Sequence, residues 1–373
     1  MRLNRIIIDN FKNIASASLE LSPKVNCFLG DNGMGKSNLL DAVHYLSFCR
    51  SFSGVADSLI MRRGSDFVTL RGEYLRGGTE EVLQLGMGQG RRKTFRRGGK
   101  EYDRLSAHIG LFPLVMVAPQ DIDLIRDTPE VRRRWLDMVI SQSDSAYLDR
   151  LIRYNHGLEQ RNRLLRDGMT DHHLYEVIEM QMEAAATYIS DTRTTMVERL
   201  SEIFARYYRA VAGEEAEKVA LAYDGWRAKA PDGSLRRLFD ECRRHDEMVR
   251  HTSTGPHRDD IAMTLDGMAA RRTGSQGQCK TFTVALRLAQ YDFLRQATGL
   301  KPLLLLDDIF DKLDASRVER IMRLVTDDEG FGQIFITDTN RKHLDDIIGL
   351  TRGEHRLWTV DHGTFTLSTP PTV

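Results

Sequence analysis

One eight-residue stretch near the N-terminus constrains the fold of this chain more than any other feature. It matches G-x-x-x-x-G-K-[ST], with an apolar run at 25–29 before it and a helical pattern at 36–48 after it. Glycines let such a loop wrap around phosphate oxygens, and the following helix directs its positive end to the same anion. The pattern predicts an ATP site in an α/β fold, and the alternative is a glycine-rich turn without function. The predicted site residues are Gly30, Asp31, Asn32, Gly33, Met34, Gly35, Lys36 and Ser37.

A second motif supplies the acids that such a site requires. The run LLLL at 303–306 predicts a buried strand, and Asp307 and Asp308 follow it directly. In P-loop ATPases Lys36 would reach the β- and γ-phosphates, and Ser37 and Asp307 would serve Mg²⁺. Asp308 would be the catalytic residue that orients or deprotonates the attacking water. The alternative is an ordinary strand with a polar end.

A third motif precedes a predicted helix at 279–297. Glycines and a serine at a helix N-terminus form another anion site. Two phosphate sites on one chain suggest a sandwich dimer, in which the second site of one subunit caps the γ-phosphate held by the other. The alternative is a helix that is merely N-capped. The residues expected to act on the partner subunit's nucleotide are Ser275, Gln276, Gly277 and Gln278.

The middle of the chain has a helical pattern from about 129 to 211. Between Ile178 and Val211 apolar or small residues recur every three or four positions, without Gly or Pro. This pattern predicts a helix of ~35 residues, ~50 Å long, that projects as an arm. We therefore expect an ATPase head lobe from residues 1–125 and 250–373, with an antiparallel β meander at about 66–105. The helical arm domain, 126–249, would be inserted between the two parts of the head.

Charge and cysteine content limit the partners. Lys plus Arg and Asp plus Glu both number 53, so any binding to DNA must come from local basic patches. The four cysteines have no metal-site spacing, and no apolar run predicts a signal peptide or membrane span, so we expect a cytoplasmic protein without membrane partners. Two basic runs are candidate contacts to DNA phosphates, and the alternative is a solvated charged face. The candidates are Arg91, Arg92, Lys93, Arg96, Arg97, Arg132 and Arg133.

Several stretches resemble a known family. The S-x-G-Q motif with the downstream acid pair is similar to the signature and Walker B motifs of ABC-ATPases, including Rad50 and SMC heads. Three blocks resemble the RecF family: GDNGMGKSNLLDAVHYLSFCR at 30–50, GPHRDD at 255–260 and LLDDIFDKLD at 305–314. The stretches at 9–13 and 119–137 also resemble that family, so the similarity spans nearly the whole chain.

The resemblance implies a fold and further site residues. The fold would be an ABC-ATPase P-loop head of the Rad50/SMC type with an inserted helical arm. Lys12 and Asn13 would touch the nucleotide, and Asp314 would be the D-loop acid at the dimer interface. Gln120 would be the Q-loop ligand near Mg²⁺, although relatives often carry an acid nearby. Where relatives have a switch histidine this chain has TDTN at 337–340, which leaves the γ-phosphate sensor open.

The resemblance also implies a function. It is ATP-dependent DNA binding in recombinational repair and replication restart, with ATP and Mg²⁺ as cofactors and weak, DNA-stimulated ATP hydrolysis that resets an ATP-dependent homodimer. Duplex DNA, single/double-strand junctions and the mediators RecR and RecO would be partners, and the strand-exchange recombinase would be loaded at gapped DNA. An SMC-like chromosome-structuring ATPase would need much longer coiled coils. A transporter-associated ABC subunit would need membrane partners, and an ATP-dependent nuclease would need a further metal-carboxylate domain.

Overall fold

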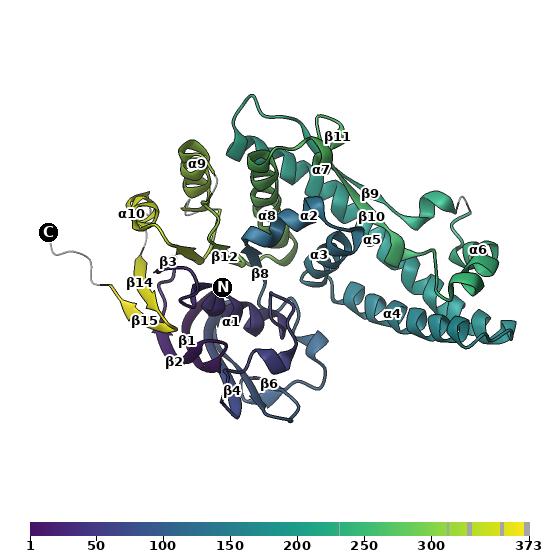
Figure 1. Cartoon of the computed structure of the whole chain (residues 1–373), viewed down its shortest axis with the longest axis horizontal. Coiled ribbons are helices and arrows are strands. Elements are labelled where there is room, and N and C mark those ends of the chain that lie inside the picture. Colours follow the sequence, from purple (N-terminus) through teal and green to yellow (C-terminus); the bar gives the residue numbers. More distant parts are fainter. Residues whose placement is uncertain (231, 312, 327–329, 351–353, 369–373) are drawn as a thin grey trace. The chain divides into compact units, whose positions relative to one another are not determined.

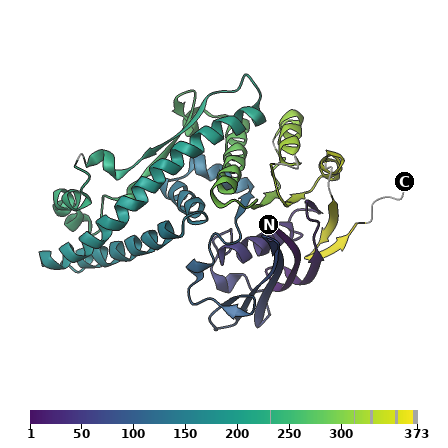
Figure 2. The ribbon, with the colours of Figure 1, turned by 180° about the vertical axis from the view of Figure 1, so that it is seen from behind.

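The computed structural model describes residues 1–230, 232–311, 313–326, 330–350 and 354–368. The chain divides into two compact units, which Figures 1 and 2 show from opposite sides. The first, called the head unit, contains Met1–Asp121, Ala210–Ala212 and Lys280–Val373. The second, called the helical unit, contains Ile122–Arg209 and Gly213–Cys279.

The head unit contains a six-stranded sheet in the spatial order β15-β14-β3-β13-β12-β8. Neighbouring strands from β14 to β8 pair in parallel, whereas β15 pairs antiparallel with β14. Strands β12 and β13 are buried at every residue, as is typical of parallel strands covered on both faces. The strands are β3 (Val25–Leu29), β8 (Leu114–Val117), β12 (Leu303–Asp307), β13 (Ile334–Asp338), β14 (His355–Asp361) and β15 (Thr364–Leu367).

A second sheet of the head unit is antiparallel, in the order β2-β1-β4-β5-β6-β7. Along β4 buried residues alternate with more exposed ones, so one face of the sheet meets the core. The predicted meander at 66–105 is confirmed, and it continues into the first two strands of the chain. The strands are β1 (Arg2–Phe11), β2 (Ile14–Glu20), β4 (Phe67–Arg76), β5 (Thr79–Gly88), β6 (Thr94–Arg97) and β7 (Lys100–Glu101).

Helix α1 (Lys36–Phe48) packs against strands of both sheets, among them β1, β4, β12 and β13. Eleven of its 13 residues are buried, including the polar Asp41, His44 and Ser47. A helix buried along most of its length has a fixed position, because close packing leaves it no room to shift. The predicted helix at 36–48 is confirmed, and its first turn is held firmly at the end of the glycine-rich loop.

Three further helices contribute to the head unit. Helix α8 (Gln276–Thr298) confirms the helix predicted at 279–297, and its residues from Lys280 onward belong to the head unit. Helix α9 (Ala315–Thr326) packs against α10 (Arg341–Leu350). Helix α10 also contacts β3 and β13. The helix thus follows β13 and packs back against the parallel sheet.

The helical unit consists of helices and a three-stranded sheet in the order β11-β10-β9. The 41-residue helix α5 confirms the long helix predicted from Ile178 to Val211. One of its faces packs along α4 through hydrogen bonds of Glu179 with Arg161 and of Tyr188 with Asp144. The elements are α2 (Asp123–Arg126), α3 (Pro129–Ser141), α4 (Ser145–Arg166), α5 (His172–Ala212), β9 (Val219–Asp224), α6 (Leu235–Val249), β10 (Asp260–Leu265), β11 (Met268–Ala269) and α7 (Ala270–Thr273).

Buried arginines hold this unit together. Arg161 on α4 donates to Glu179 on α5 at 2.8 Å and to Asp246 on α6 at 2.7 Å. Arg193 on α5 similarly reaches Asp137 on α3 at 2.8 Å and the carbonyl oxygen of Pro256 at 2.8 Å. The GPHRDD segment at 255–260 is therefore hydrogen-bonded into the core of the helical unit.

The observed units divide the chain differently from the expected lobes at one point. The first boundary between the two units follows Asp121, close to the expected boundary at 125. Residues 250–279 were expected in the head lobe, but they belong to the helical unit. The reason is strand pairing, because β10 pairs with β9 over six residues.

None of the described helices is both long enough and apolar enough to cross a membrane.

Candidate nucleotide site and basic surface

Three of the predicted motifs meet at one edge of the parallel sheet. Gly30 follows β3, Asp308 follows β12 and Gln120 follows β8 after a short turn. These strands run in the same direction and are joined through β13, so their carboxyl ends lie at the same edge. Open α/β sheets bind ligands outside this edge. The topology therefore brings together residues that are almost 280 positions apart in the sequence.

The glycine-rich loop leaves backbone donors free for an anion. The N–H groups of Lys36, Ser37 and Asn38 open α1 and make no hydrogen bond within the described part of the chain. Gly35 has φ 114° and contributes no side-chain cap, a conformation that strongly favours glycine. At Gly30 a Cβ atom would lie 2.4 Å from the carbonyl oxygen of Val360. These features form a cradle for phosphate oxygens.

Lys36 lies inside this loop. Its Nζ donates to the carbonyl oxygens of Gly30 at 2.5 Å and Asp31 at 2.9 Å. Burial lowers the pKa of Lys36, and the surrounding carboxylates, led by Asp308 and Asp307, act in the opposite direction. The ammonium group is therefore held beside the loop in an acidic environment.

Ser37 and Asp307 lie together as predicted. The Ser37 hydroxyl donates to Asp307 Oδ1 at 2.9 Å, and the Thr337 hydroxyl donates to the same oxygen at 2.7 Å. Burial raises the pKa of the Asp307 carboxyl, and the nearby charge of Asp308 raises it further. A cation beside Asp307 would oppose both effects. Hydroxyl and carboxylate oxygens are also the donors that Mg²⁺ prefers, so the residues fit this ion.

Asp308 differs from Asp307 in having a free carboxylate. Its backbone N–H donates to the Thr337 hydroxyl at 3.0 Å. Its side chain makes no hydrogen bond or ion pair within the described ranges, yet it lies close enough to influence Lys36. Its φ of 48° is unusual for a residue other than glycine, and such strained conformations concentrate at functional sites.

Lys12 and Asn13 brace the loop from the turn after β1. Lys12 Nζ pairs with Asp41 Oδ2 on α1 at 2.6 Å. Asn13 Oδ1 accepts a hydrogen bond from Asn38 Nδ2 at 2.8 Å, and Asn13 Nδ2 donates one to the carbonyl oxygen of Gly33 in the loop at 3.4 Å. Both side chains thus make internal contacts, and their contact with nucleotide stays a prediction.

Gln120 is exposed in the turn after β8, and its neighbour fixes that turn. Asp121 is buried, accepts from the backbone N–H of Ala118 at 2.9 Å and pairs with Arg287 on α8 at 2.5 Å. Gln120 therefore lies exposed in a turn whose conformation is fixed by its neighbour. Its role as a ligand near Mg²⁺ stays a prediction.

The predicted signature residues lie at the start of α8, with Ser275 directly before the helix and Gln276, Gly277 and Gln278 in its first turn. Ser275 and Gln278 make a reciprocal capping box: Ser275 N–H donates to Gln278 Oε1 at 2.7 Å, and Gln278 N–H donates to Ser275 Oγ at 3.2 Å. Gln278 also donates to Glu217. Asp314 has a comparable place before α9, where it accepts from Ser316 at 2.6 Å and from Arg317 N–H at 2.9 Å. Both motifs cap helices, and their contacts across a dimer interface stay predictions.

The basic run at 91–97 splits into paired and free side chains. Lys93 pairs with Asp57 at 2.8 Å, and Arg97 forms two hydrogen bonds with Glu81. Arg91 and Arg92 are exposed and pair with no acid among the described residues. Arg96 is also exposed, on the opposite side of β6 from the buried Phe95. Lys93 and Arg97 are therefore engaged by acids of this unit, whereas Arg91, Arg92 and Arg96 are the more accessible candidates, and DNA contact by all five stays a prediction.

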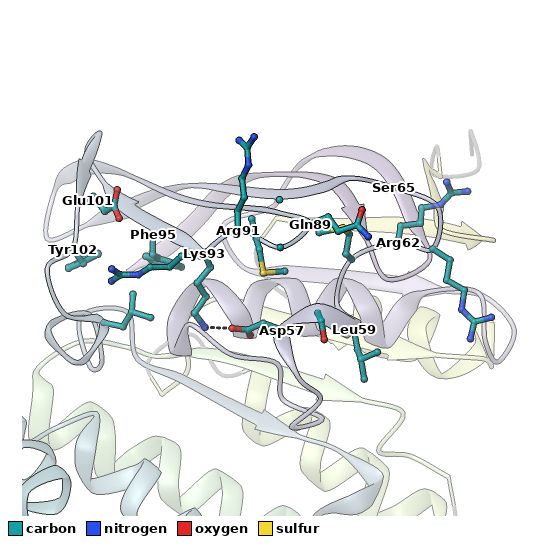
Figure 3. Close-up of a pocket in the computed structure, with 18 residues that line it drawn as sticks. Asp57, Leu59, Arg62, Ser65, Gln89, Arg91, Lys93, Phe95, Glu101 and Tyr102 are labelled. Carbon is teal, nitrogen blue, oxygen red and sulfur yellow. Dashed lines mark ion pairs between the residues drawn. The ribbon is translucent and has the colours of Figure 1, made fainter. Parts of the chain in front are cut away.

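A pocket of about 890 Å³ adds two residues to this surface (Figure 3). Arg62 and Arg63 line it together with Arg91 and Arg92, and all four are exposed without an acidic partner in the described ranges. Arg62 and Arg63 could not be predicted from the basic run, because they are almost 30 residues from it in the sequence. Strand pairing of β4 with β5 brings the loops together: Phe67 pairs with Gly88.

The second basic run is not an exposed patch. Arg132 is buried and forms a bidentate pair with Asp260 at 2.7 and 3.0 Å. Arg133 donates to the carbonyl oxygen of Asp259 at 2.6 Å, and burial lowers its pKa. We therefore withdraw Arg132 as a DNA contact, since breaking its ion pair would leave Asp260 without its cation, and Arg133 is a weaker candidate than expected.

Sequence comparison identifies close relatives. A family described as "AAA domain, putative AbiEii toxin, Type IV TA system" matches residues 25–337. The chain is 48% identical over 363 residues to the DNA replication and repair protein RecF of Parabacteroides distasonis, covering 97% of this chain and 98% of that relative. It is 47% identical over 369 residues to RecF of Phocaeicola vulgatus, covering 98% of each chain.

Structural comparison agrees. A solved structure of "the recombination mediator protein RecF-ATPrS in RecFOR pathway" superposes with a TM-score of 0.87 at 28% identity, covering 99% of this chain and 98% of that chain. An SMC head bound to the C-winged helix domain of ScpA has a TM-score of 0.60 at 13% identity over 99% of this chain and 97% of that chain, which shows a shared fold alone. The predicted fold class, a P-loop head related to SMC heads, is confirmed. The chain belongs to the AAA-domain family and to the RecF family of DNA replication and repair proteins.

Proposed function

We propose that this protein binds DNA in an ATP-dependent manner during recombinational repair and replication restart. The observation that carries the proposal is the meeting of the phosphate loop, the Ser37–Asp307 pair and the Asp308 carboxylate, which has no partner among the described residues, at one sheet edge. The relatives named DNA replication and repair protein RecF support the biological context.

ATP hydrolysis at this site would use the residues in distinct roles. The first turn of α1 and Lys36 bind the phosphates, and Ser37 and Asp307 would hold Mg²⁺, which supplies charge neutralisation when bound. Asp308 accepts a proton from a water molecule as the water oxygen attacks the γ-phosphorus. The bond from that phosphorus to the bridging oxygen breaks, and ADP leaves with the electron pair.

ATP would also control assembly. Ser275 and its neighbours would cap the γ-phosphate bound by a second subunit, with Asp314 at the same interface. The relative described as RecF-ATP supports nucleotide binding in the family. Because the γ-phosphate adds contacts only in the dimer, ATP would favour the dimer and ADP would favour it much less. Slow hydrolysis, stimulated by DNA, would return the protein to monomers.

DNA would contact the pocket face that carries Arg62, Arg63, Arg91 and Arg92. In Figure 3 Arg91 and Arg62 extend in different directions from the pocket. Several separate cations suit a polymer that presents many phosphates, because each cation can neutralise a different phosphate. We propose duplex DNA and its junctions with single strands as the ligand. RecR and RecO are the proposed partners in loading the recombinase at gaps.

A charge-matched pair of variants tests this surface. Replacing Arg62, Arg63, Arg91 and Arg92 with Ala should weaken duplex binding and lower the salt slope by about one for each lost phosphate contact. Fluorescence anisotropy at several salt concentrations, with ATP present, measures both quantities. ATP-driven dimerisation should persist.

The control removes the same charge from arginines that already have acidic partners one helical turn away. Its four substitutions are Arg153→Ala, Arg163→Ala, Arg237→Ala and Arg323→Ala. Equal losses in both variants would mean that only overall charge matters, and an unchanged isotherm in the first variant would remove this face from the DNA-binding proposal.

A further inference from the structure

The carboxyl end of β13 lies between the two halves of the candidate site. In the sheet Asp338 is opposite Leu29, the last residue of β3, and Thr337 is opposite Asp307 on β12. The backbone N–H of Gly30 points to the carbonyl oxygen of Asp338, at 3.4 Å. The residues that follow β13 therefore enter the site between the phosphate loop and the acid pair.

A carboxylate–histidine pair occupies this place. Asp338 is buried, and its Oδ2 lies 2.9 Å from His343 Nδ1, while its Oδ1 accepts from the backbone N–H of Asn340 at 2.8 Å. His343 is the third residue of α10 and is about one-third exposed. Its ring and that of Phe310 form a T-shaped pair, with ring centroids 6.0 Å apart. Phe310 lies two residues beyond Asp308, so the imidazole is held next to the acid-pair segment.

The pair also lies in the electrostatic environment of the phosphate-binding lysine. The charge of Asp338 acts on Lys36 together with those of Asp308 and Asp307. With Nδ1 directed to Asp338, Nε2 is the nitrogen left for a ligand, and within the described residues its hydrogen-bond contact is the long one to Asn340 Nδ2 at 3.5 Å. Both nitrogens of a protonated imidazole donate, so one can serve Asp338 and the other an anion.

We infer that His343 is a γ-phosphate contact, with Asp338 as the residue that positions its ring. The inference rests on the proposed ATP site and names a residue for the role that the TDTN segment left open. A group that touches only the terminal phosphate strengthens binding of ATP and leaves binding of ADP unchanged. His343 would thereby make the site respond to the nucleotide state.

The test compares ATP and ADP affinity in the full-length protein, together with steady-state hydrolysis. His343→Ala should leave ADP affinity within about twofold, reduce the preference for ATP over ADP by about tenfold or more, and slow turnover, since one hydrogen bond to a charged group is lost. Asp338→Asn keeps the shape but weakens the hold on the ring, so it should shift the same preference in the same direction by a smaller factor.

Two comparisons make the outcomes distinct. His173→Ala in the helical unit removes an exposed histidine beside Glu176, and it should change none of these quantities. His343→Gln retains an amide donor, and it should recover part of the ATP preference lost in His343→Ala. If the wild-type protein binds neither nucleotide, the proposed function itself fails. If the wild type prefers ATP and His343→Ala keeps the full preference, only the inference about His343 is overturned.

Discussion

Single residues in the nucleotide site fall into two groups, those that brace the site and those with free functional groups. Thr337 illustrates the first group, because its hydroxyl donates to Asp307 and accepts from the backbone of Asp308. Asp308 belongs to the second group. This difference between two adjacent acids is the basis for assigning one to the metal and the other to water.

Asp308→Asn should separate nucleotide binding from hydrolysis. The amide keeps the size of the side chain but accepts protons poorly, so turnover should fall by about 10²- to 10⁴-fold, the usual contribution of a general base. ATP affinity should stay within a few-fold, and the ATP-bound dimer should accumulate. Phosphate release and equilibrium nucleotide binding measure these quantities.

The control is Glu80→Gln, which makes the same chemical change at an exposed site on β5. It should leave both measurements unchanged. Loss of ATP binding in Asp308→Asn would assign Asp308 to the structure of the site or to metal binding.

At the scale of helices and strands, local sequence patterns predicted the individual helices well, but they did not predict which distant strands pair with each other. Helix α1 and the long helix α5 follow from apolar periodicity within their own sequences. The placement of residues 250–279 in the helical unit depends on β9 and β10, which are separated by α6. No local pattern encodes that pairing.

The candidate site shows the same limit. The phosphate loop and the acid pair have sequence signatures, so their residues could be predicted one by one. Arg132 and Arg97 looked like solvent-facing cations in the sequence, because their partners Asp260 and Glu81 lie at distant positions. Arg62 and His343 carried no motif, and only the fold places them beside the relevant segments.

The contacts among α4, α5 and α6 depend on Arg161, whose side chain is fully buried. Arg161→Met should destabilise the protein by about 3–5 kcal/mol, because Asp246 and Glu179 would stay buried with a lost partner. Thermal or urea unfolding measures the loss. Arg163→Met, two residues away on the same helix, changes a side chain that is 79% exposed and should cost less than about 0.5 kcal/mol. Equal stability of the two variants would contradict a structural role for the buried ion pairs.

For the whole molecule, buried neutral histidines predict a decrease in stability under mildly acidic conditions. Burial lowers the pKa of His44, His108 and His257 from 6.5 to about 4. Between these values the unfolded chain binds protons that the folded protein excludes, so the free energy of unfolding falls as pH falls from 6.5 to 4. At pH 5 the loss is about 2 kcal/mol per histidine.

Urea unfolding at pH 7 and pH 5 checks this prediction. His257→Gln removes one of the three titrating groups and should reduce the decrease between the two pH values by about 2 kcal/mol. The exposed His173→Gln should leave the decrease as in the wild type. A free energy of unfolding that is equal at pH 7 and pH 5 would contradict the burial of these histidines in neutral form.

We propose that ATP assembles two copies of this chain around shared nucleotide sites and that the assembly binds DNA. Sedimentation velocity tests it most directly, with the wild type and Ser275→Arg each in ADP, ATP, and ATP plus duplex DNA. We expect a monomer in ADP, a dimer in ATP and a dimer on DNA for the wild type. Ser275→Arg should bind ATP but sediment as a monomer throughout, because bulk and charge are added where the partner's γ-phosphate would dock. Identical sedimentation of the wild type in ADP and ATP, or an ATP-dependent dimer of Ser275→Arg, would contradict the account.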